Sequence, residues 1–249
     1  MKIVADIGNT QIKWARVVGD RLEAVGQAMH AGSAGAALEA LGAALVSASH
    51  VVAANVAGEE VAELLSARVA DHGANLTLVR PASEQFGVRC AYRDPARLGA
   101  DRWAAVVAAH QLVDGAACVI DAGTTVTLDA VAVDGQHLGG LIFAGPEIVA
   151  DALSRETRGI GDTTPARAAP IGLEVLGAST NDAVAHGAML AIAAGLDRAI
   201  AEIGAALGVP TTVILTGGGA GELESWLETP VSYRPQFVLE GLAYIASEL

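Results

Sequence analysis

The sequence predicts an α/β fold built from two similar halves. Each half opens with an apolar strand that runs into the pattern Asp-x-Gly-x-Thr, first at 6–10 and again at 121–125. After each of these turns the same order follows: two further strands joined at a tight turn, and then helices that alternate with strands. Such a plan, repeated along one chain, indicates a duplicated α/β architecture.

In the first half, residues 2–5 are apolar without alternation, which is typical of a strand buried on both faces. Gly19-Asp20 is a plausible tight turn between the next two strands. Acidic residues in a first helical turn and a glycine after the last turn mark a helix within 59–73. The other segments expected here are a helix over 34–48, a strand within 50–58, a strand over 75–80 and a helix over 101–113.

The second half repeats this order from residue 117, with Asp134-Gly135 as the hairpin turn. The boundary is expected near Asp114-Gly115, which gives halves of 1–113 and 114–249. Ligands of such folds usually bind in the cleft between halves. The later segments expected are helices over 146–155 and about 180–207, a strand, glycine loop and helix within 211–227, a short strand at 231–233 and a helix over 237–247.

Composition narrows the class of partner. The 249 residues carry a formal charge of −13 and only 4% aromatic residues, so neither a basic face nor a stacking platform for nucleic acid is expected. Asp6 interrupts the first apolar run too early for a signal peptide, and the chain is expected to be cytoplasmic and soluble, without a membrane partner. Neither the two cysteines nor the six histidines have zinc-site spacing, and all eight are interpreted as structural.

The two Asp-x-Gly-x-Thr turns carry the strongest chemical signal. The glycine lets backbone amides approach a phosphate, the threonine adds a donor, and the acid can hold a cation or its water. Lys13 adds a positive charge beside the first turn. A single turn of this kind is more simply a tight hairpin with an Asx hydrogen bond, but two matched copies favour phosphate binding.

Two further stretches are ambiguous when taken alone. "LTGGGAGE" at 215–222 is a strand-to-helix glycine loop that can face a nucleotide, although many such turns are rich in glycine. In "CAYRDPARLGADRWAA", Asp101 stands at a helix start, where an acid stabilises the helix by ~0.3–1 kcal/mol. The functional interpretation makes Asp101 a base for a substrate hydroxyl, with Arg102 binding a carboxylate and Tyr92 lining the same pocket. An anion site is also one interpretation of four arginines in this region, Arg89, Arg93, Arg97 and Arg102.

Taken together and in order, five motifs resemble type III pantothenate kinase, the first enzyme of coenzyme A synthesis. They are "DIGNTQIK", "LGADRW", "DAGTT", "STNDAVAHG" and "LTGGGA", and the resemblance covers nearly the whole chain. It implies the superfold of acetate and sugar kinases, Hsp70 and actin, in which two ribonuclease-H-like halves surround a nucleotide. The implied reaction is the ATP-dependent phosphorylation of pantothenate to 4′-phosphopantothenate.

The resemblance also implies roles for individual residues. Asp101 would be the catalytic proton acceptor, Asp6 would lie near Mg²⁺, and Asp121 would hold a monovalent cation, K⁺ or NH₄⁺. Thr180 would contact the substrate, and the homodimer that the resemblance implies would let Thr180 reach the substrate of the partner subunit. The residues implied in ATP binding are Asp6, Ile7, Gly8, Asn9, Thr10, Gln11, Ile12, Lys13 and Thr124, and those implied in pantothenate binding are Tyr92, Gly99, Ala100, Asp101, Arg102 and Thr180.

One departure and two alternatives accompany the resemblance. Relatives read roughly G-G-x-I-x-P-G after the second hairpin, whereas this chain reads "GGLIFAGPEIV", so the contribution of 144–147 stays open. Some members of this family were first described as accessory factors for transcription, which makes a regulator without direct DNA contact one alternative. Another small-molecule kinase of the superfold is the second, although it would share the turns and not "LGADRW".

Overall fold

The computed structural model describes residues 1–19, 21–30, 33–160 and 172–249. The chain forms two compact units. Unit 1 contains Met1–Val113, Asp134–His137 and Gln236–Leu249, and unit 2 contains Asp114–Val133 and Leu138–Pro235. The assignment of 1–113 and 114–249 to two duplicated halves stays a prediction. In the described residues, no helix is long and apolar enough to cross a membrane.

Unit 1 is built on a five-stranded sheet in the order β3-β2-β1-β4-β5. The first three strands form antiparallel hairpins, and β4 and β5 then add in parallel to β1. This parallel addition brings the carboxyl ends of β1 and β4 to one edge of the sheet. The strands are β1 Lys2–Ile7, β2 Gln11–Val18, β3 Arg21–Met29, β4 His50–Asn55 and β5 Asn75–Leu78.

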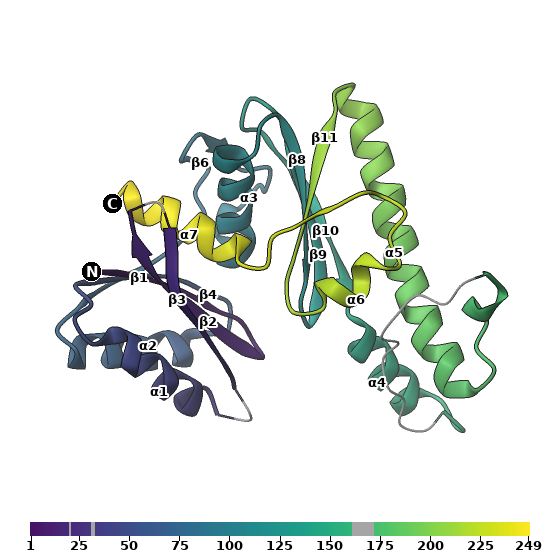
Figure 1. Cartoon of the computed structure of the whole chain (residues 1–249), viewed down its shortest axis with the longest axis horizontal. Coiled ribbons are helices and arrows are strands. Elements are labelled where there is room, and N and C mark those ends of the chain that lie inside the picture. Colours follow the sequence, from purple (N-terminus) through teal and green to yellow (C-terminus); the bar gives the residue numbers. More distant parts are fainter. Residues whose placement is uncertain (20, 31–32, 161–171) are drawn as a thin grey trace. The chain divides into compact units, whose positions relative to one another are not determined.

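Helices cover both faces of this sheet. Leu41 of α1 and Leu65 of α2 share one hydrophobic cluster with Ile3 and Ile7 of β1, while α3 and α7 pack together and α7 contacts β1 and β4. Figure 1 shows α1 and α2 lying side by side along the sheet. Val4, which alternates with Ile3, is also fully buried, as expected for a strand covered twice. The helices are α1 Ala34–Leu45, α2 Glu59–Asp71, α3 Ala100–Leu112 and α7 Phe237–Ser247.

Unit 2 repeats the sheet of unit 1, in the order β10-β9-β8-β11-β12. Here too the first strand pairs antiparallel with the second and parallel with the fourth. The same strand order in both sheets confirms the predicted duplicated α/β fold. The strands are β8 Ala116–Ala122, β9 Thr125–Val131, β10 His137–Ala144, β11 Thr211–Thr216 and β12 Ser232–Tyr233.

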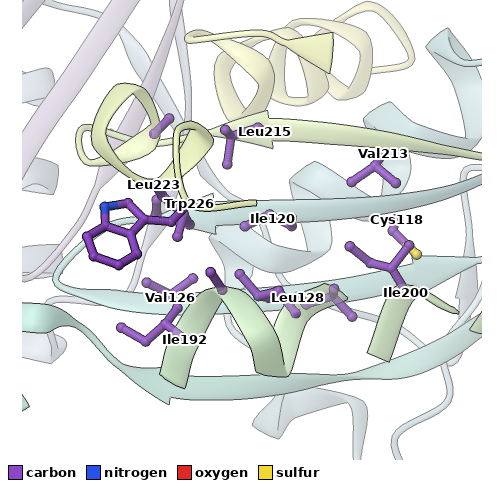
Figure 2. Close-up of a cluster of buried hydrophobic side chains, with 14 of the residues drawn as sticks. Cys118, Ile120, Val126, Leu128, Ile192, Ile200, Val213, Leu215, Leu223 and Trp226 are labelled. Carbon is purple, nitrogen blue, oxygen red and sulfur yellow. The ribbon is translucent and has the colours of Figure 1, made fainter. Parts of the chain in front are cut away.

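One long helix, α5, supplies most of the helical side of the unit 2 core. Figure 2 shows Ile192 and Ile200 of α5 beside Val126 and Leu128 of β9, with Trp226 at one end of the cluster. The small side chains of this alanine-rich chain let the helix approach the sheet closely. The helices are α4 Pro146–Glu156, α5 Thr180–Leu207 and α6 Ala220–Glu224.

The predicted elements agree with the structure except at a few ends and in one loop. The helix expected over 34–48 ends at Leu45, because Ser47 adopts a left-handed conformation with φ 68°. A short hairpin of β6 Glu84–Gln85 and β7 Val88–Arg89, and the 3-10 turns at Pro95–Arg97 and Gly172–Val175, were not predicted. Asp20 of the expected Gly19-Asp20 turn lies outside the described residues.

Candidate functional site

The first Asp-x-Gly-x-Thr turn joins β1 to β2 at the carboxyl end of β1. The Gly8 N–H donates to the Gln11 carbonyl at 3.0 Å, which closes a turn whose tip residues, Asn9 and Thr10, are exposed. Asp6 lies opposite Lys13 in the antiparallel register, so the acid and the lysine stand on the same face of the hairpin. The turn therefore presents backbone, side-chain donors and a lysine around one carboxylate.

The ATP-binding residues predicted in this segment divide between the turn and its flanking strands. Ile7 and Ile12 are paired across the hairpin and fully buried, so their side chains anchor the turn in the core. Only their backbones are available to a ligand. The residues of the segment with some exposure are Asp6, Gly8, Asn9, Thr10, Gln11 and Lys13.

The second turn joins β8 to β9 in the same way but is one residue shorter. Its Gly123 N–H donates to the Thr125 carbonyl at 3.0 Å, and Asp121 pairs with Thr127. Thr125 therefore corresponds to Gln11 in hydrogen bonding. The simple alignment of Thr10 with Thr125 is wrong by one position, since Thr124 stands at the exposed tip of the shorter turn. A neutral threonine also replaces Lys13 in the second hairpin.

The glycine loop after β11 packs directly against the end of β8. Thr216 pairs with Asp121 in the parallel register, and the Gly219 N–H donates to the Ala122 carbonyl at 2.8 Å. Gly217 has φ 97°, and a Cβ there would stand 2.5 Å from Asp121 Oδ1 and clash with the Ala122 carbonyl. Only glycine fits this position, so the loop and the second turn form one unit.

Gly145, immediately before α4, is a site residue that sequence reasoning missed. It is buried, and a Cβ there would clash with the Thr124 carbonyl and lie 3.0 Å from its carbon. Gly145 therefore packs closely against the backbone at the tip of the second turn. The Gly145-Pro146 pair was the available signal, but it lies in the segment where the expected family pattern is not matched.

The stretch around Asp101 forms the start of α3, in unit 1. Gly99 is the residue that caps the helix, Ala100 begins it, and the Arg102 N–H donates to Asp101 Oδ1 at 2.7 Å. Gly99 lies beside Val56, whose N–H donates to the Ile7 carbonyl at 3.0 Å. This chain of contacts brings the start of α3 to the carboxyl edge of β1 and β4, the edge that carries the Asp6 turn.

Tyr92 and Arg102 contact each other, as the sequence suggested. Arg102 is buried, and its Nη1 donates to the Tyr92 hydroxyl at 3.0 Å. The guanidinium carbon also lies 5.8 Å from the centre of the tyrosine ring. This pairing fixes the direction of both side chains beside Asp101.

The four arginines near Asp101 do not form one positive cluster. Arg89 makes an ion pair with Asp134 at 2.6 Å, while Arg93 and Arg97 are exposed. A backbone hydrogen bond from Gln136, and then the Arg89 side chain, lower the pKa of the exposed Asp134 carboxyl. Of the four, Arg102 is the one that the structure joins to the predicted acceptor residues.

Thr180 lies in unit 2, at the first turn of α5. The Asp182 N–H donates to Ser179 Oγ at 3.1 Å, and the Ser179 hydroxyl donates back to the Asp182 carboxylate at 2.7 Å, which caps the helix. Thr180 is exposed and borders a pocket with a volume of about 540 Å³ between β10, α4 and α5. Among the described residues that line this pocket, Thr180 has the one polar side chain.

The donor atoms around the two aspartates suit hard cations. In the described residues, no three His, Cys, Asp or Glu side chains are grouped as a metal site. Mg²⁺ in phosphate-transfer sites takes few protein ligands and completes its shell with water and phosphate oxygens. Asp6 fits that pattern, and the Asp121 carboxylate beside the Ala122 carbonyl supplies oxygen ligands of the kind a monovalent cation needs.

Burial raises the pKa of Cys118 to about 11, so this thiol stays protonated in the core.

Comparison with known proteins shows the family to which the chain belongs. The family model described as type III pantothenate kinase matches residues 2–202. A type III pantothenate kinase of Nitrosococcus oceani is 34% identical over 256 residues, with 100% of this chain and 94% of the relative covered.

Two solved structures share the fold over almost the whole length. A protein from Sinorhizobium meliloti described as a 2-dehydro-3-deoxygalactonokinase has a TM-score of 0.64 at 19% identity, covering 100% of this chain and 99% of the other. One from Campylobacter jejuni described as a Baf family transcriptional activator has a TM-score of 0.62 at 18% identity, covering 99% and 98%. These likenesses show that the chain shares the fold of both proteins. The match of sequence along the full chain identifies the family: this chain belongs to the type III pantothenate kinases.

Proposed function

We propose that this chain transfers the γ-phosphoryl group of ATP to the primary hydroxyl of pantothenate, giving 4′-phosphopantothenate, the first step of coenzyme A synthesis. The observation that carries the proposal is the combination within one chain of two Asp-x-Gly turns and an acid-bearing helix start. In unit 1, both Asp6 and Asp101 belong to the carboxyl edge of the sheet, linked through the contacts of Val56 and Gly99.

Phosphoryl transfer depends mainly on positioning and on charge stabilisation. Backbone amides and side chains of Asp6–Lys13 hold the triphosphate in unit 1, and Thr124 is the ATP-binding residue proposed in unit 2. Lys13 is the positive side chain of the first hairpin, and its partial exposure leaves the ammonium group able to reach a phosphate oxygen. The glycine loop at 217–219 receives the nucleoside against bare backbone.

The acceptor is held by the stretch around Asp101. Arg102 offers its guanidinium to the pantothenate carboxylate, and Tyr92, Gly99 and Ala100 line the acceptor site. Asp101 accepts the proton of the attacking hydroxyl, and the Arg102 N–H that donates to Asp101 Oδ1 orients this carboxylate at the helix start. The proton leaves the hydroxyl as the new P–O bond forms and the bond to ADP breaks.

Cations complete the proposal. Mg²⁺, held near Asp6, would offset the charge of the β- and γ-phosphates, and K⁺ or NH₄⁺ would bind at Asp121. Both substrates are anions and the chain itself carries a formal charge of −13. Local donors and bound cations must therefore supply the positive field that the chain lacks as a whole.

Removal of cations is expected to stop turnover. In a chelator-treated buffer that contains sodium as its sole cation, ADP release should fall to background, and Mg²⁺ with K⁺ should restore it together. Asp121→Asn should weaken the K⁺ response more than the Mg²⁺ response. Titration of each cation at saturating substrates measures this, and full activity in the sodium buffer would contradict both cation assignments.

We also propose a homodimer, with Thr180 reaching the acceptor site of the partner subunit. Support comes from β10, an edge strand of its sheet whose Leu138, Leu141 and Ile142 side chains are exposed. An exposed apolar edge of this kind is usually covered in native proteins. The apolar pocket between β10, α4 and α5 continues this surface up to Thr180.

The dimer has a direct test in solution. Leu141→Lys combined with Ile142→Lys should convert the protein to a monomer and reduce pantothenate turnover. The lysines introduced on β10 of one subunit would repel those on β10 of the other. Val133→Lys changes another exposed apolar residue of unit 2 and is the matched control. Light scattering after gel filtration measures the mass, and a wild-type chain that runs as a monomer at micromolar concentration would refute the dimer.

A substrate panel separates the proposed function from its alternatives. ADP release should be seen with pantothenate and not with sugars, acetate, glycerol or water alone. Activity toward a sugar would instead indicate another small-molecule kinase of the superfold, and no activity with any acceptor would favour an accessory regulator. The cytoplasm, where ATP and pantothenate meet, is the compartment that this function requires.

A further inference from the structure

We infer that His137 is a positioning residue for the acceptor site, where it fixes the ring of Tyr92. This inference rests on the proposed function, because Tyr92 matters for turnover only if pantothenate binds beside it. His137 belongs to the tip of the β9–β10 hairpin, residues 134–137, which is grouped with unit 1 although the flanking strands belong to unit 2. No motif in the sequence marks it.

The hairpin tip is held on β7 by a network around Arg89. The Arg89 N–H donates to the Gly135 carbonyl at 2.9 Å, and its side chain bonds Asp134 at 2.6 Å and Gln136 Oε1 at 3.2 Å. In return, Gln136 Nε2 donates to the Arg89 carbonyl at 3.3 Å. Backbone and side-chain bonds in both directions give the tip a single register on β7.

Close backbone contact between the hairpin tip and the β6–β7 hairpin restricts the tip to the same register. Gly135 has φ 80°, and a Cβ there would clash with the Gly87 carbonyl and lie 3.1 Å from His110 Nε2. Gln111 at the end of α3 donates to the Phe86 carbonyl at 2.6 Å. The tip, the β6–β7 hairpin and α3 therefore form one packed body, and Tyr92 follows β7 by three residues.

His137 contacts the chain at Tyr92 in two ways. Its Nδ1 accepts a hydrogen bond from the Ala91 N–H at 3.4 Å, which fixes the backbone just before Tyr92. Its ring lies nearly parallel to the Tyr92 ring, with centres 6.2 Å apart and planes 19° apart. The side chain is fully buried, so its position is set by packing.

Tyr92 is consequently fixed from two directions. His137 holds its backbone and ring, and Arg102 holds its hydroxyl at 3.0 Å. Arg102 is the residue proposed to bind the pantothenate carboxylate. A change at His137 should reach the acceptor through Tyr92 and its bond to Arg102, while the ATP-binding turns are left unchanged.

Kinetics of His137 variants test this inference. His137→Ala should raise KM for pantothenate by about tenfold, with kcat and KM for ATP within about twofold, as expected when binding common to ground and transition states is lost. His137→Asn retains an acceptor near the position of Nδ1 and should recover part of the loss. His50→Ala, which removes a half-buried histidine bonded to Thr77 in the same unit, is the stability control.

A double-mutant cycle decides whether His137 acts through Tyr92. In a Tyr92→Ala background, His137→Asn should change KM for pantothenate by less than about twofold, because the residue it positions is absent. If the effects of the two substitutions on KM for pantothenate add in full, the inference is overturned. It is also overturned if KM rises equally for pantothenate and ATP and the rise follows the loss of thermal stability. A wild-type protein inactive with pantothenate would overturn the proposed function and this inference with it, whereas active wild type with unaffected variants overturns the inference alone.

Discussion

Asp101→Asn is expected to lower kcat by about 10²–10⁴-fold, the usual loss when a general base is removed, while ATP binding changes by less than about twofold. Asparagine keeps an oxygen that can accept from the Arg102 N–H, so the start of α3 should survive. It cannot take a proton from a substrate hydroxyl. The loss should therefore fall on the chemical step, with the fold and the nucleotide site intact.

Asp94 offers a matched control in the same loop. Its Oδ1 accepts from the Ala96 N–H at 3.2 Å, so Asp94→Asn also replaces a carboxylate that caps a helical turn. This variant should retain most of the wild-type kcat. Rapid-quench measurement of phosphoryl transfer together with calorimetric ATP binding distinguishes the two, and a near-normal kcat in Asp101→Asn would refute the assignment of the base.

Gly217→Ala is expected to destabilise the protein by about 2–5 kcal/mol and to remove most cation-dependent activity. The new methyl group would stand 2.5 Å from Asp121 Oδ1 and clash with the Ala122 carbonyl, and alanine would also be strained at φ 97°. The loop or the end of β8 must then move. Either movement displaces the oxygen atoms proposed to bind the monovalent cation.

The neighbouring Gly218 provides the control for Gly217. A Cβ at Gly218 has no atom within 4 Å and no left-handed strain, so Gly218→Ala should change the free energy of unfolding by less than about 1 kcal/mol. Urea unfolding with and without K⁺ measures both variants. Equal stability of the two would show that contact between the glycine loop and Asp121 does not support the site.

The fold could be predicted because its signals are local and occur twice. Each signal lies within a short segment of the sequence. Examples are the continuous apolar strand at 2–5, the glycines that follow helices and the two matched Asp-x-Gly turns. Their repetition predicted the same order of elements in both halves, and the two sheets have the same strand order. The helix over 34–48 was too long because nothing in the sequence indicates that Ser47 takes a left-handed conformation.

The part that could not be predicted depends on contacts between distant segments. Arg89 belonged to an apparent basic cluster, yet its partner Asp134 lies 45 residues away on a hairpin tip. The sequence also does not show that the second turn is one residue shorter, because the two motifs have Asp, Gly and Thr at the same spacing. Only the hydrogen bonds of the two turns reveal this difference. His137 carries no motif, and the Gly145-Pro146 pair lies where the expected family pattern is not matched, so the roles of both residues follow from their contacts.

The central claim is that the Asp6 turn binds the triphosphate of ATP, with Asp101 directed at the acceptor hydroxyl. A crystal structure with pantothenate, Mg²⁺, K⁺ and a non-hydrolysable ATP analogue tests it most directly. We expect the Asp6 turn to contact phosphate oxygens and the Asp101 carboxylate to lie about 2.6–3.2 Å from the primary hydroxyl of pantothenate. Phosphates bound away from the Asp6 turn, or an acceptor hydroxyl directed away from Asp101, would contradict it.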